Sequence, residues 1–476
     1  MNKPLRKSSK EPPKQSPEKP PKNSPMQVAY LTGEYPRVTD TFIQLEVAEL
    51  RRLGATVKPY SVRRPRDEQS LSLAQKQERD RTTYLLPANP LSLLTAHLNL
   101  LTKHPSRYVS ALSLAWKTRQ LGIRGTLYQL IYFIEAGLLA HRLHQHDISH
   151  LHNHIGDSSG TVTMLASALG NFGYSFTLHG PGIFFEPKRW RIDEKIARAQ
   201  FVNCISQFCR SQAMIFAPIE SWPKLKIVHC GVNPESFNPE SSSPPNAQSD
   251  SLSAAVNSGK HLLYVGRLAA AKGLPILLQS LSKLTLDHPD IHLTVVGDGP
   301  DRKLLENQVR HLSLADHVDF VGYQPPAEVR RYLRATDIFV MSSFAEGVPV
   351  VLMEAMMAAR PVVATQIAGI SELVENGVNG FLVPPSDPQQ LGDRIHKLLA
   401  NSALRQQFGQ QGQQKVSAEF NIHREAKKLY QLIDAAIEGH SVEDLLLRVI
   451  ADERLSRNAS RASELETPEY SVGVRN

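Results

Sequence analysis

Cysteine is scarce in this 476-residue chain, which contains Cys204, Cys209 and Cys230. An odd and sparse count supplies neither a disulfide framework nor the paired C-x-x-C ligands of a structural zinc site. Such a count is typical of a protein kept in a reducing compartment. We therefore expect a cytoplasmic location.

Long apolar runs are missing as well. The longest run, at 125–140, is too short to cross a bilayer and includes Gln129 and Glu135. Residues 1–25 are dominated by Lys, Pro and Ser and contain no apolar segment of a secretory signal. The sequence predicts a cytoplasmic chain, either free in solution or peripheral on the inner face of the plasma membrane.

Positive charge exceeds negative charge, but much of the excess is local. The formal net charge is +8, and residues 1–25 hold seven Lys or Arg against two Glu. The remainder of the chain is nearly balanced, so its basicity does not indicate a nucleic-acid partner. With 41% hydrophobic and 21% charged residues, the composition is that of a globular protein.

An alternation of short apolar segments with helical segments begins at Met26. The first unit is a strand at 28–31 that stops at Gly33, a helix capped by Asp40, and a second strand at 56–62. This order is typical of a parallel α/β domain. A Leu-rich segment with a helical period follows at 91–143, interrupted by Pro105. Further strands are predicted at 148–151, 175–178, 201–205, 226–229, 262–265, 292–296, 318–321, 338–341 and 362–364.

The strands fall into two groups, separated by a stretch rich in Ser, Pro and Asn. We therefore predict two doubly wound, Rossmann-like parallel-sheet domains that face each other across a cleft, with ligands at the carboxyl ends of the strands. The predicted parts are a disordered basic tail at 1–25, an N-terminal domain at 26–237, a linker at 238–260, a C-terminal domain at 261–420, a helix at 421–440 that crosses back to the N-terminal domain, and a helical or disordered tail at 441–476.

The loop at 265–273 follows one predicted strand and precedes a helix. Gly266 allows a tight turn, and Arg267 and Lys272 bring two cations to one loop. Two cations beside the N–H groups of a helix start suit a diphosphate. A solvated loop with unrelated charges is the alternative.

The segment 343–355 places two glutamates around a helix start. Glu346 lies in the loop, Pro349 suits the first turn of the helix, and Glu354 lies within it. Two carboxylates so placed can bind hydroxyls at both ends of a nucleotide sugar, and the N–H groups of 347–350 can bind phosphate oxygens between them. For Glu346 alone, interaction with the helix dipole is the simpler interpretation.

Together the two segments resemble the donor site of the large retaining family 4 of the GT-B glycosyltransferases. The family pattern is a glutamate, seven residues and a second glutamate, and Glu346 and Glu354 have this spacing. Similar segments follow in order at 295–300, 368–374 and 379–384. In the N-terminal half, the segments that resemble exopolysaccharide (colanic-acid-type) members lie at 35–43, 150–154, 176–179 and 228–233.

The resemblance implies a role for each matched residue. The catalytic roles fall to His179, at the reacting centre, and to Glu346, which would bind hydroxyls of the transferred sugar. The nucleotide and its ribose would be bound by Glu354, Gly297 and Asp298. The donor diphosphate would be bound by Gly33, Arg267, Lys272, Gly347, Val348, Pro349 and Val350. After His179 the family commonly has another polar residue, whereas this chain has Gly180, Pro181 and Gly182, which leaves the acceptor open.

Three histidines, His150, His152 and His154, alternate along a predicted strand. Histidines in this pattern more often line a cleft than hold zinc, and the sequence offers no second ligand pair. We expect no metal and no cofactor, because Arg267 and Lys272 would take the charge-neutralising role of Mg²⁺.

The sequence thus predicts a retaining hexosyltransferase for extracellular or cell-surface polysaccharide biosynthesis. Its partners would be a nucleotide-diphosphate sugar and a saccharide or lipid-linked saccharide acceptor. The Leu-rich segment, the basic tail and the cationic cluster at 188–191 also suggest an anionic membrane surface, although the leucines can instead pack the domain's own core. The alternatives are another GT-B enzyme (a phosphorylase or a sugar-nucleotide epimerase) and a non-catalytic peripheral membrane protein of this fold.

Overall fold

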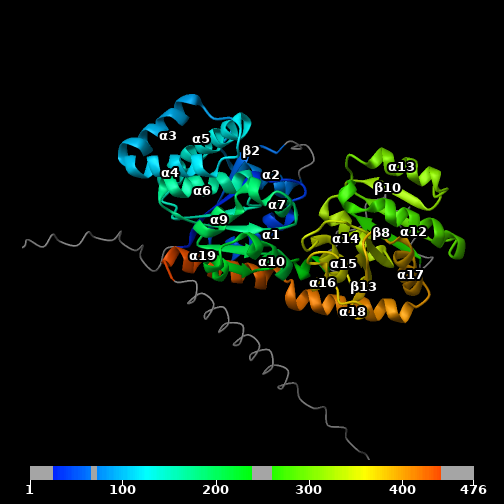
Figure 1. Cartoon of the computed structure of the whole chain (residues 1–476). Helices are drawn as coiled ribbons and strands as arrows, with labels where there is room; N and C mark the ends of the chain where they lie inside the picture. Colours follow the sequence, from blue (N-terminus) through cyan, green and yellow to red (C-terminus); the bar gives the residue numbers. More distant parts are fainter. Residues whose placement is uncertain (1–24, 66–71, 239–259, 441–476) are drawn as a thin grey trace, which may run out of the picture.

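A computed structural model describes residues 25–65, 72–238 and 260–440 of the chain. The predicted tails and linker lie almost wholly outside these residues. Each half of the described chain is built on one parallel β-sheet with helices on both faces (Figure 1). The prediction of two doubly wound α/β domains is confirmed.

The N-terminal domain contains a seven-stranded sheet in the order β3-β2-β1-β4-β5-β6-β7, and each neighbouring pair is parallel. Its strands are β1 (Gln27–Glu34), β2 (Thr56–Arg63), β3 (Thr83–Tyr84), β4 (His150–His154), β5 (Gly173–Leu178), β6 (Phe201–Cys204) and β7 (Leu225–Ile227). Its helices are α1 (Thr41–Arg52), α2 (Leu73–Arg81), α3 (Pro90–Lys103), α4 (Pro105–Thr118), α5 (Ile123–Gln145), α6 (Ser158–Gly170), α7 (Gly182–Phe185), α8 (Pro187–Trp190), α9 (Ile192–Arg198) and α10 (Gln207–Phe216), with 3₁₀ turns η2 (Ile219–Lys224) and η3 (Pro234–Phe237).

The C-terminal domain contains a six-stranded parallel sheet in the order β10-β9-β8-β11-β12-β13. Its strands are β8 (His261–Val265), β9 (His292–Val296), β10 (Val318–Gly322), β11 (Ile338–Met341), β12 (Val362–Thr365) and β13 (Gly380–Val383). Its helices are the 3₁₀ turn η5 (Ala270–Lys272), α12 (Leu274–Asp287), α13 (Arg302–His311), α14 (Pro326–Ala335), α15 (Val350–Met357), α16 (Ile370–Leu373), α17 (Pro388–Leu399) and α18 (Ser402–Glu419).

Strands such as β11 and β12 are buried along their whole length. Helices cover both faces of a parallel sheet, so its strands are continuous apolar runs, and this is why short runs in the sequence predicted them. Two strands were not predicted. Strand β3 has two residues at the sheet edge, and β13 begins with a glycine.

Two details at the start of the N-terminal domain differ from the prediction. Strand β1 continues through Gly33 to Glu34, because it keeps pairing with β2 there; Gly33 is thus part of a strand and not of the following loop. Asp40 is the residue before α1, but its side chain makes no cap hydrogen bond. The carboxylate instead accepts two hydrogen bonds from Arg37, at 2.7 and 3.0 Å, a charge-assisted bidentate pair.

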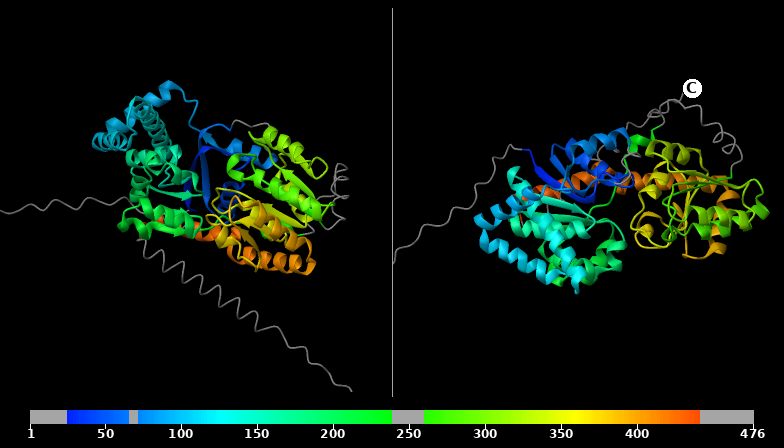
Figure 2. Two further views of the ribbon diagram at one scale, coloured as in Figure 1. Left: turned by 45° about the vertical axis from the view of Figure 1, so that its right-hand side comes forward. Right: turned by 90° about the horizontal axis from the view of Figure 1, so that it is seen from above.

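After the C-terminal domain the chain returns to the N-terminal domain as α19 (Ile422–Glu438), which lies against α1, β4 and β5 (Figures 1 and 2). At the crossing point Val232 donates its N–H to Phe420 and accepts from Ile422, at 2.9 and 3.0 Å. The apolar face of α19 is buried in a core cluster with α1 and β1. The final helix is therefore a structural part of the N-terminal domain.

Burial of α19 makes a prediction about stability. Leu429 is fully buried in this cluster, and its replacement by alanine should lower the free energy of unfolding by about 2–5 kcal/mol. Leu286 on α12 is 83% exposed, so Leu286→Ala should change it by less than about 0.5 kcal/mol. Urea denaturation of both variants measures the difference. Equal stabilities would show that α19 does not contribute to the folded core.

Candidate active site

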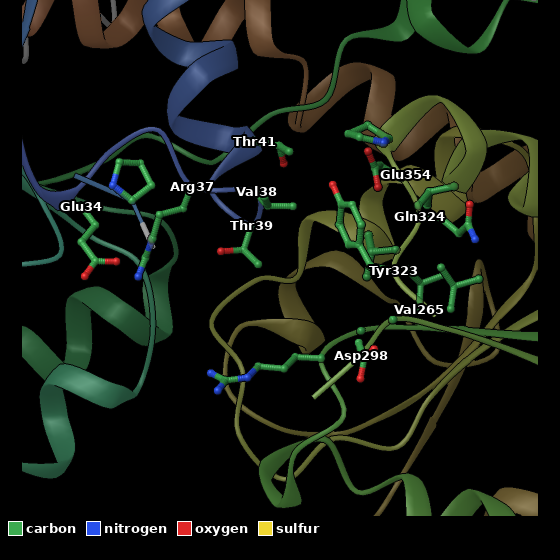
Figure 3. Close-up of a pocket in the computed structure, with 18 residues that line it drawn as sticks. Glu34, Arg37, Val38, Thr39, Thr41, Val265, Asp298, Tyr323, Gln324 and Glu354 are labelled. Carbon is green, nitrogen blue, oxygen red and sulfur yellow. The ribbon is translucent and has the colours of Figure 1, made fainter. Parts of the chain in front are cut away.

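A cleft of about 530 Å³ lies between the two domains at the carboxyl ends of their strands (Figure 3). Figure 3 shows Glu34, Arg37 and Thr39 across the cleft from Tyr323, Gln324 and Glu354. The N-terminal domain contributes Glu34, Arg37, Val38, Thr39, Thr41 and Pro65. The C-terminal domain contributes Val265, Gly266, Arg267, Val296, Gly297, Asp298, Tyr323, Gln324, Pro326, Val329, Val351 and Glu354. The cleft lies where ligands bind in doubly wound sheets.

The loops after β8 and β9 touch each other beside the cleft. Gly297 has φ of 131°, and a side chain there would overlap the carbonyl oxygen of Gly266. Glycine tolerates both the positive φ and the close approach. Arg267 is exposed and lines the cleft next to this contact. The predicted residues Arg267, Gly297 and Asp298 are therefore brought together.

Glu354 reaches the same cleft from α15. Desolvation by burial raises the pKa of its carboxyl to about 7, and the charge of Arg330 opposes this shift. Near neutral pH the carboxyl therefore changes between a protonated form, which can donate a hydrogen bond, and an ionised form, which can only accept.

Of the two predicted cations, Arg267 lines the cleft and Lys272 forms an ion pair. Lys272 pairs with Glu346, with 2.6 Å between Nζ and Oε1, and Ser343 donates its hydroxyl to the same oxygen at 2.7 Å. Neither Lys272 nor Glu346 lines the cleft that Arg267 faces. Because Glu346 is buried, the ion pair and the hydroxyl compensate the loss of water around its carboxylate.

The predicted phosphate loop at 347–350 contacts the N-terminal domain. Gly347 has no room for a side chain, because an added Cβ would overlap the carbonyl oxygen of His179. Val348 is buried, and Val350 begins α15. Pro349 is the residue before the helix, not a residue of its first turn as predicted. None of the four lines the cleft, although Val351 does.

His179 is held by a chain of side chains within the N-terminal domain. Its Nε2 lies 2.7 Å from Nδ1 of His154, whose Nε2 lies 3.1 Å from the carboxylate of Glu46. Tyr30 also donates its hydroxyl to Glu46, at 2.8 Å. Burial, and then the charge of His154, lower the pKa of His179 well below its usual value. His179 is therefore a neutral imidazole at physiological pH.

The carboxylate of Glu46 determines where the protons lie in this hydrogen-bonded network of side chains. Glu46 can only accept, so His154 donates from Nε2, and with one proton on each ring its Nδ1 accepts from Nε2 of His179. The remaining nitrogen of His179, Nδ1, then carries no proton and lies 3.6 Å from Sγ of Cys230. Burial is the main cause that raises the pKa of the Cys230 thiol, which stays protonated and can donate to this nitrogen.

Glu46, His152 and His154 have potential ligand atoms close enough together to hold a metal ion. The ring nitrogens of His152, however, lie 2.8 and 2.9 Å from the hydroxyls of Ser175 and Thr177. Those of His154 are bonded to Glu46 and His179. The ring nitrogens of His152 and His154 are thus all within hydrogen-bond distance of other side chains.

A second contact joins the domains beyond the cleft. The carboxylate of Glu372 accepts hydrogen bonds from the backbone N–H groups of Gln207 and Phe208, at 2.7 and 2.8 Å. Gln207 begins α10, so a carboxylate of the C-terminal domain caps a helix of the N-terminal domain. The sequence indicated that the segment 368–374, which contains Glu372, resembles the family, but it did not indicate that Glu372 would bind the start of α10.

Several residues of the cleft received no role from the sequence. Arg37 and Thr39 lie in the segment at 35–43 that was matched, and Tyr323 and Gln324 follow β10. The position of a loop after a parallel strand is the signal that could have found Tyr323 and Gln324. Gly33, in contrast, does not line the cleft, although its neighbour Glu34 does.

Residues 251–415 match the family described as glycosyl transferases group 1. The amylovoran biosynthesis glycosyltransferase AmsK of Erwinia amylovora is 31% identical over 217 residues, which are 44% of this chain and 51% of that protein. The putative colanic acid biosynthesis glycosyltransferase WcaL of Salmonella typhimurium is 32% identical over 188 residues, covering 36% and 45%. The chain spans about half the length of the curated relatives it matches.

Solved structures are similar over more of the chain. HepE from Anabaena, solved in complex with UDP-glucose, has a TM-score of 0.66 at 19% identity and covers 86% of this chain and 100% of its own. A sucrose-phosphate synthase from Thermosynechococcus elongatus has a TM-score of 0.67 at 20% identity, covering 87% and 100%. The fold is that of the GT-B glycosyltransferases, and the family match supports a place for this chain among the group 1 glycosyltransferases.

Proposed function

We propose that the chain is a retaining glycosyltransferase that moves a hexosyl group from a nucleotide-diphosphate sugar to a saccharide or lipid-linked saccharide acceptor. The reaction would serve extracellular or cell-surface polysaccharide biosynthesis, at the cytoplasmic side of the membrane. The similarity to the amylovoran and colanic acid glycosyltransferases supports this biological setting.

The observation that carries the proposal is the cleft between the domains. One wall offers a guanidinium, a glycine loop and a carboxyl group from Arg267, Gly297 and Glu354, and the other offers polar groups of the N-terminal domain. These groups match the diphosphate and the ribose of a nucleotide sugar. Because HepE was solved with UDP-glucose, uridine diphosphate and UDP-glucose are the first ligands to test by thermal shift and calorimetry.

In the proposed reaction the bond between the anomeric carbon and the β-phosphate oxygen breaks through an oxocarbenium-like state. Negative charge then grows on the β-phosphate, where Arg267, Lys272 and the N-terminus of α15 would stabilise it. The acceptor hydroxyl attacks from the face that the phosphate leaves and gives its proton to the departing phosphate oxygen. The step needs no covalent nucleophile, metal or cofactor. NMR of the product would show whether the anomeric configuration is retained.

The two cations give the first prediction about activity. Arg267→Ala and Lys272→Ala should each lower turnover by at least about a hundredfold, because a preorganised charge for the leaving group is lost. Lys283, an exposed cation on α12 of the same domain, serves as the matched control and should be replaceable. Near-native turnover in both variants would contradict the diphosphate assignment.

Glu346 and Glu354 should have different roles in the reaction. Glu346→Ala should chiefly lower sugar transfer, and Glu354→Ala should chiefly weaken binding of free nucleoside diphosphate. Calorimetry with uridine diphosphate, together with turnover measurements, separates the two effects. Equal losses of nucleotide affinity in both variants would remove this division of roles.

The raised pKa of Glu354 adds a pH dependence to the same experiment. Below pH 7 its carboxyl is protonated, and above pH 7 it is ionised and would accept hydrogen bonds from both ribose hydroxyls. The preference for uridine diphosphate over its 2′,3′-dideoxy analogue should therefore rise between pH 6 and 8 in the native protein and stay flat in Glu354→Gln. Comparing the two ligands cancels the titration of their common diphosphate.

We further infer that Glu46 and His154 position His179 for the reaction. The network leaves Nδ1 of His179 as an acceptor 3.6 Å from Sγ of Cys230, and the backbone carbonyl of His179 lies against Gly347 of the other domain. A neutral imidazole with this tautomer can accept a hydrogen bond from a sugar hydroxyl in place of the Cys230 thiol, and it does not place a positive charge beside the oxocarbenium-like state. Glu46 would thus act through His154, 108 positions away in the sequence.

Substitutions at Glu46 test whether it positions His179 through His154. Glu46→Leu removes the acceptor for Nε2 of His154 and should lower kcat about a hundredfold through misplacement of His179, with little change in the KM of the donor. Glu46→Gln keeps an oxygen that can accept and should restore most of the rate. ¹⁵N NMR of the histidine rings reports the tautomer of His179 directly. Equal rates for the Leu and Gln variants, or an unchanged tautomer in the Leu variant, would contradict the assignment.

A further inference from the structure

Helices α3 and α4 and the start of α5 form the end of the N-terminal domain farthest from the C-terminal domain (Figures 1 and 2). The three helices pack against one another, and α4 and α5 also pack on α6. They are inserted between β3 and β4. We call residues 90–130 of these helices and their connections the outer helices.

The outer face of α3 is a row of leucines. Inner positions of the same helix, Ala96 and Leu100, are buried in the domain core. The exposed positions recur at intervals of three or four residues, so they share one face. They are Leu91, Leu94, Leu98 and Leu101, and Leu91 is 65% exposed.

The next two helices continue the pattern. On α4, Val109, Leu112 and Trp116 are exposed at the same spacing. Leu121 in the connection and Ile123 at the start of α5 are 92% and 90% exposed, and Leu127 and Leu130 of α5 are exposed as well. Single apolar side chains on a surface are ordinary, but three packed helices that all expose apolar rows indicate an interaction surface.

The charge of this surface has one sign. Residues 82–134 contain no Asp or Glu, although the whole chain has 46 acidic residues. The same stretch contains the cations Lys103, Arg107, Lys117, Arg119 and Arg124. The guanidinium of Arg119 lies 3.6 Å from the centre of the Trp116 ring, so this cation and this aromatic ring lie at the same point of the surface. Aromatic rings and cations at one level are typical of side chains in the headgroup region of a membrane.

The positive charge of the outer helices distinguishes between two possible partners for this surface, a second copy of the chain and an anionic bilayer. A second copy of the chain docked symmetrically on the outer helices would bring Arg119, stacked on Trp116, and Arg124, over Tyr128, against the same cations of its partner. Because residues 82–134 supply no acidic residue between them, this arrangement is unfavourable. An anionic bilayer offers phosphate groups to the cations and acyl chains to the leucines. We propose that the outer helices dock the protein on a bilayer that contains anionic lipid.

Docking does not depend on sugar transfer, but its use for a lipid-linked acceptor rests on the proposed function. The segment that follows His179 ends against the outer helices. Gln120 donates a hydrogen bond to the carbonyl of Arg189, at 3.4 Å, and Arg191 donates to the carbonyl of Lys117, at 3.2 Å. Residues 180–191 thus join the reacting histidine to the docking surface, along the side from which a lipid-linked acceptor would enter.

Vesicle sedimentation of the full chain tests the proposal. Native protein should bind vesicles of phosphatidylcholine and phosphatidylglycerol and bind vesicles of phosphatidylcholine alone less. The double variant Leu94→Glu, Leu98→Glu should lose at least about tenfold in partitioning to the mixed vesicles. The matched control, Leu286→Glu with Leu304→Glu, changes exposed leucines of the C-terminal domain and should bind as the native protein does. Brominated lipid should quench native fluorescence and quench Trp116→Phe much less.

Each remaining outcome has a definite meaning. Equal partitioning of native protein and the Leu94/Leu98 variant, or quenching that survives Trp116→Phe, would overturn the proposal and assign any binding to another surface, such as the basic residues at 1–25. A native dimer in sedimentation equilibrium that the double variant abolishes would assign the face to self-association. Calorimetry with uridine diphosphate, without vesicles, should give the same result for native protein and both variants. Failure of donor binding in all of them would reject the proposed function and leave docking intact.

Discussion

The backbone of Gly347 lies against the carbonyl oxygen of His179, so closely that no side chain fits between them. This contact joins the loop after β11 in one domain to the loop after β5 in the other. Helix α15 begins three residues later, and His179 is held from behind by His154 and Glu46. This approach of two backbones helps to set the position of the helix start relative to the imidazole. Glu372, which caps α10 from the other domain, holds the same arrangement from a second point.

Charge in and near the cleft is balanced within the protein. The carboxylate of Glu346 is buried with Lys272, and the carboxyl of Glu354 has a pKa near 7 because ionisation there is opposed by burial. Arg267, in contrast, faces the cleft without burial. A buried charge is tolerated when it is paired, and an exposed one is available to an anionic ligand. The observed arrangement suits a site that receives its negative charge from the substrate.

The N-terminal domain separates two kinds of surface. The carboxyl ends of its strands carry the polar groups of the cleft and the histidine network. Its outer helices carry apolar rows and cations, far from those strand ends. The segment at 180–191 connects them. The glycines and proline after His179, which distinguish this chain from many members of the family it resembles, lie at the start of this connection.

The sequence by itself determined the fold class and most of the strands, because buried parallel strands are short apolar runs and the spacing of Glu346 and Glu354 is local. It also predicted the break at Pro105. The extent of β1 past Gly33 depended on its pairing with β2, which no local pattern reports. The same is true of the pair of Lys272 with Glu346 and of the chain from Glu46 to His179. Their members are 74, 108 and 25 positions apart. Spacing along a chain reflects the periods of helices and strands, but the order in which strands cross and pair decides which side chains meet.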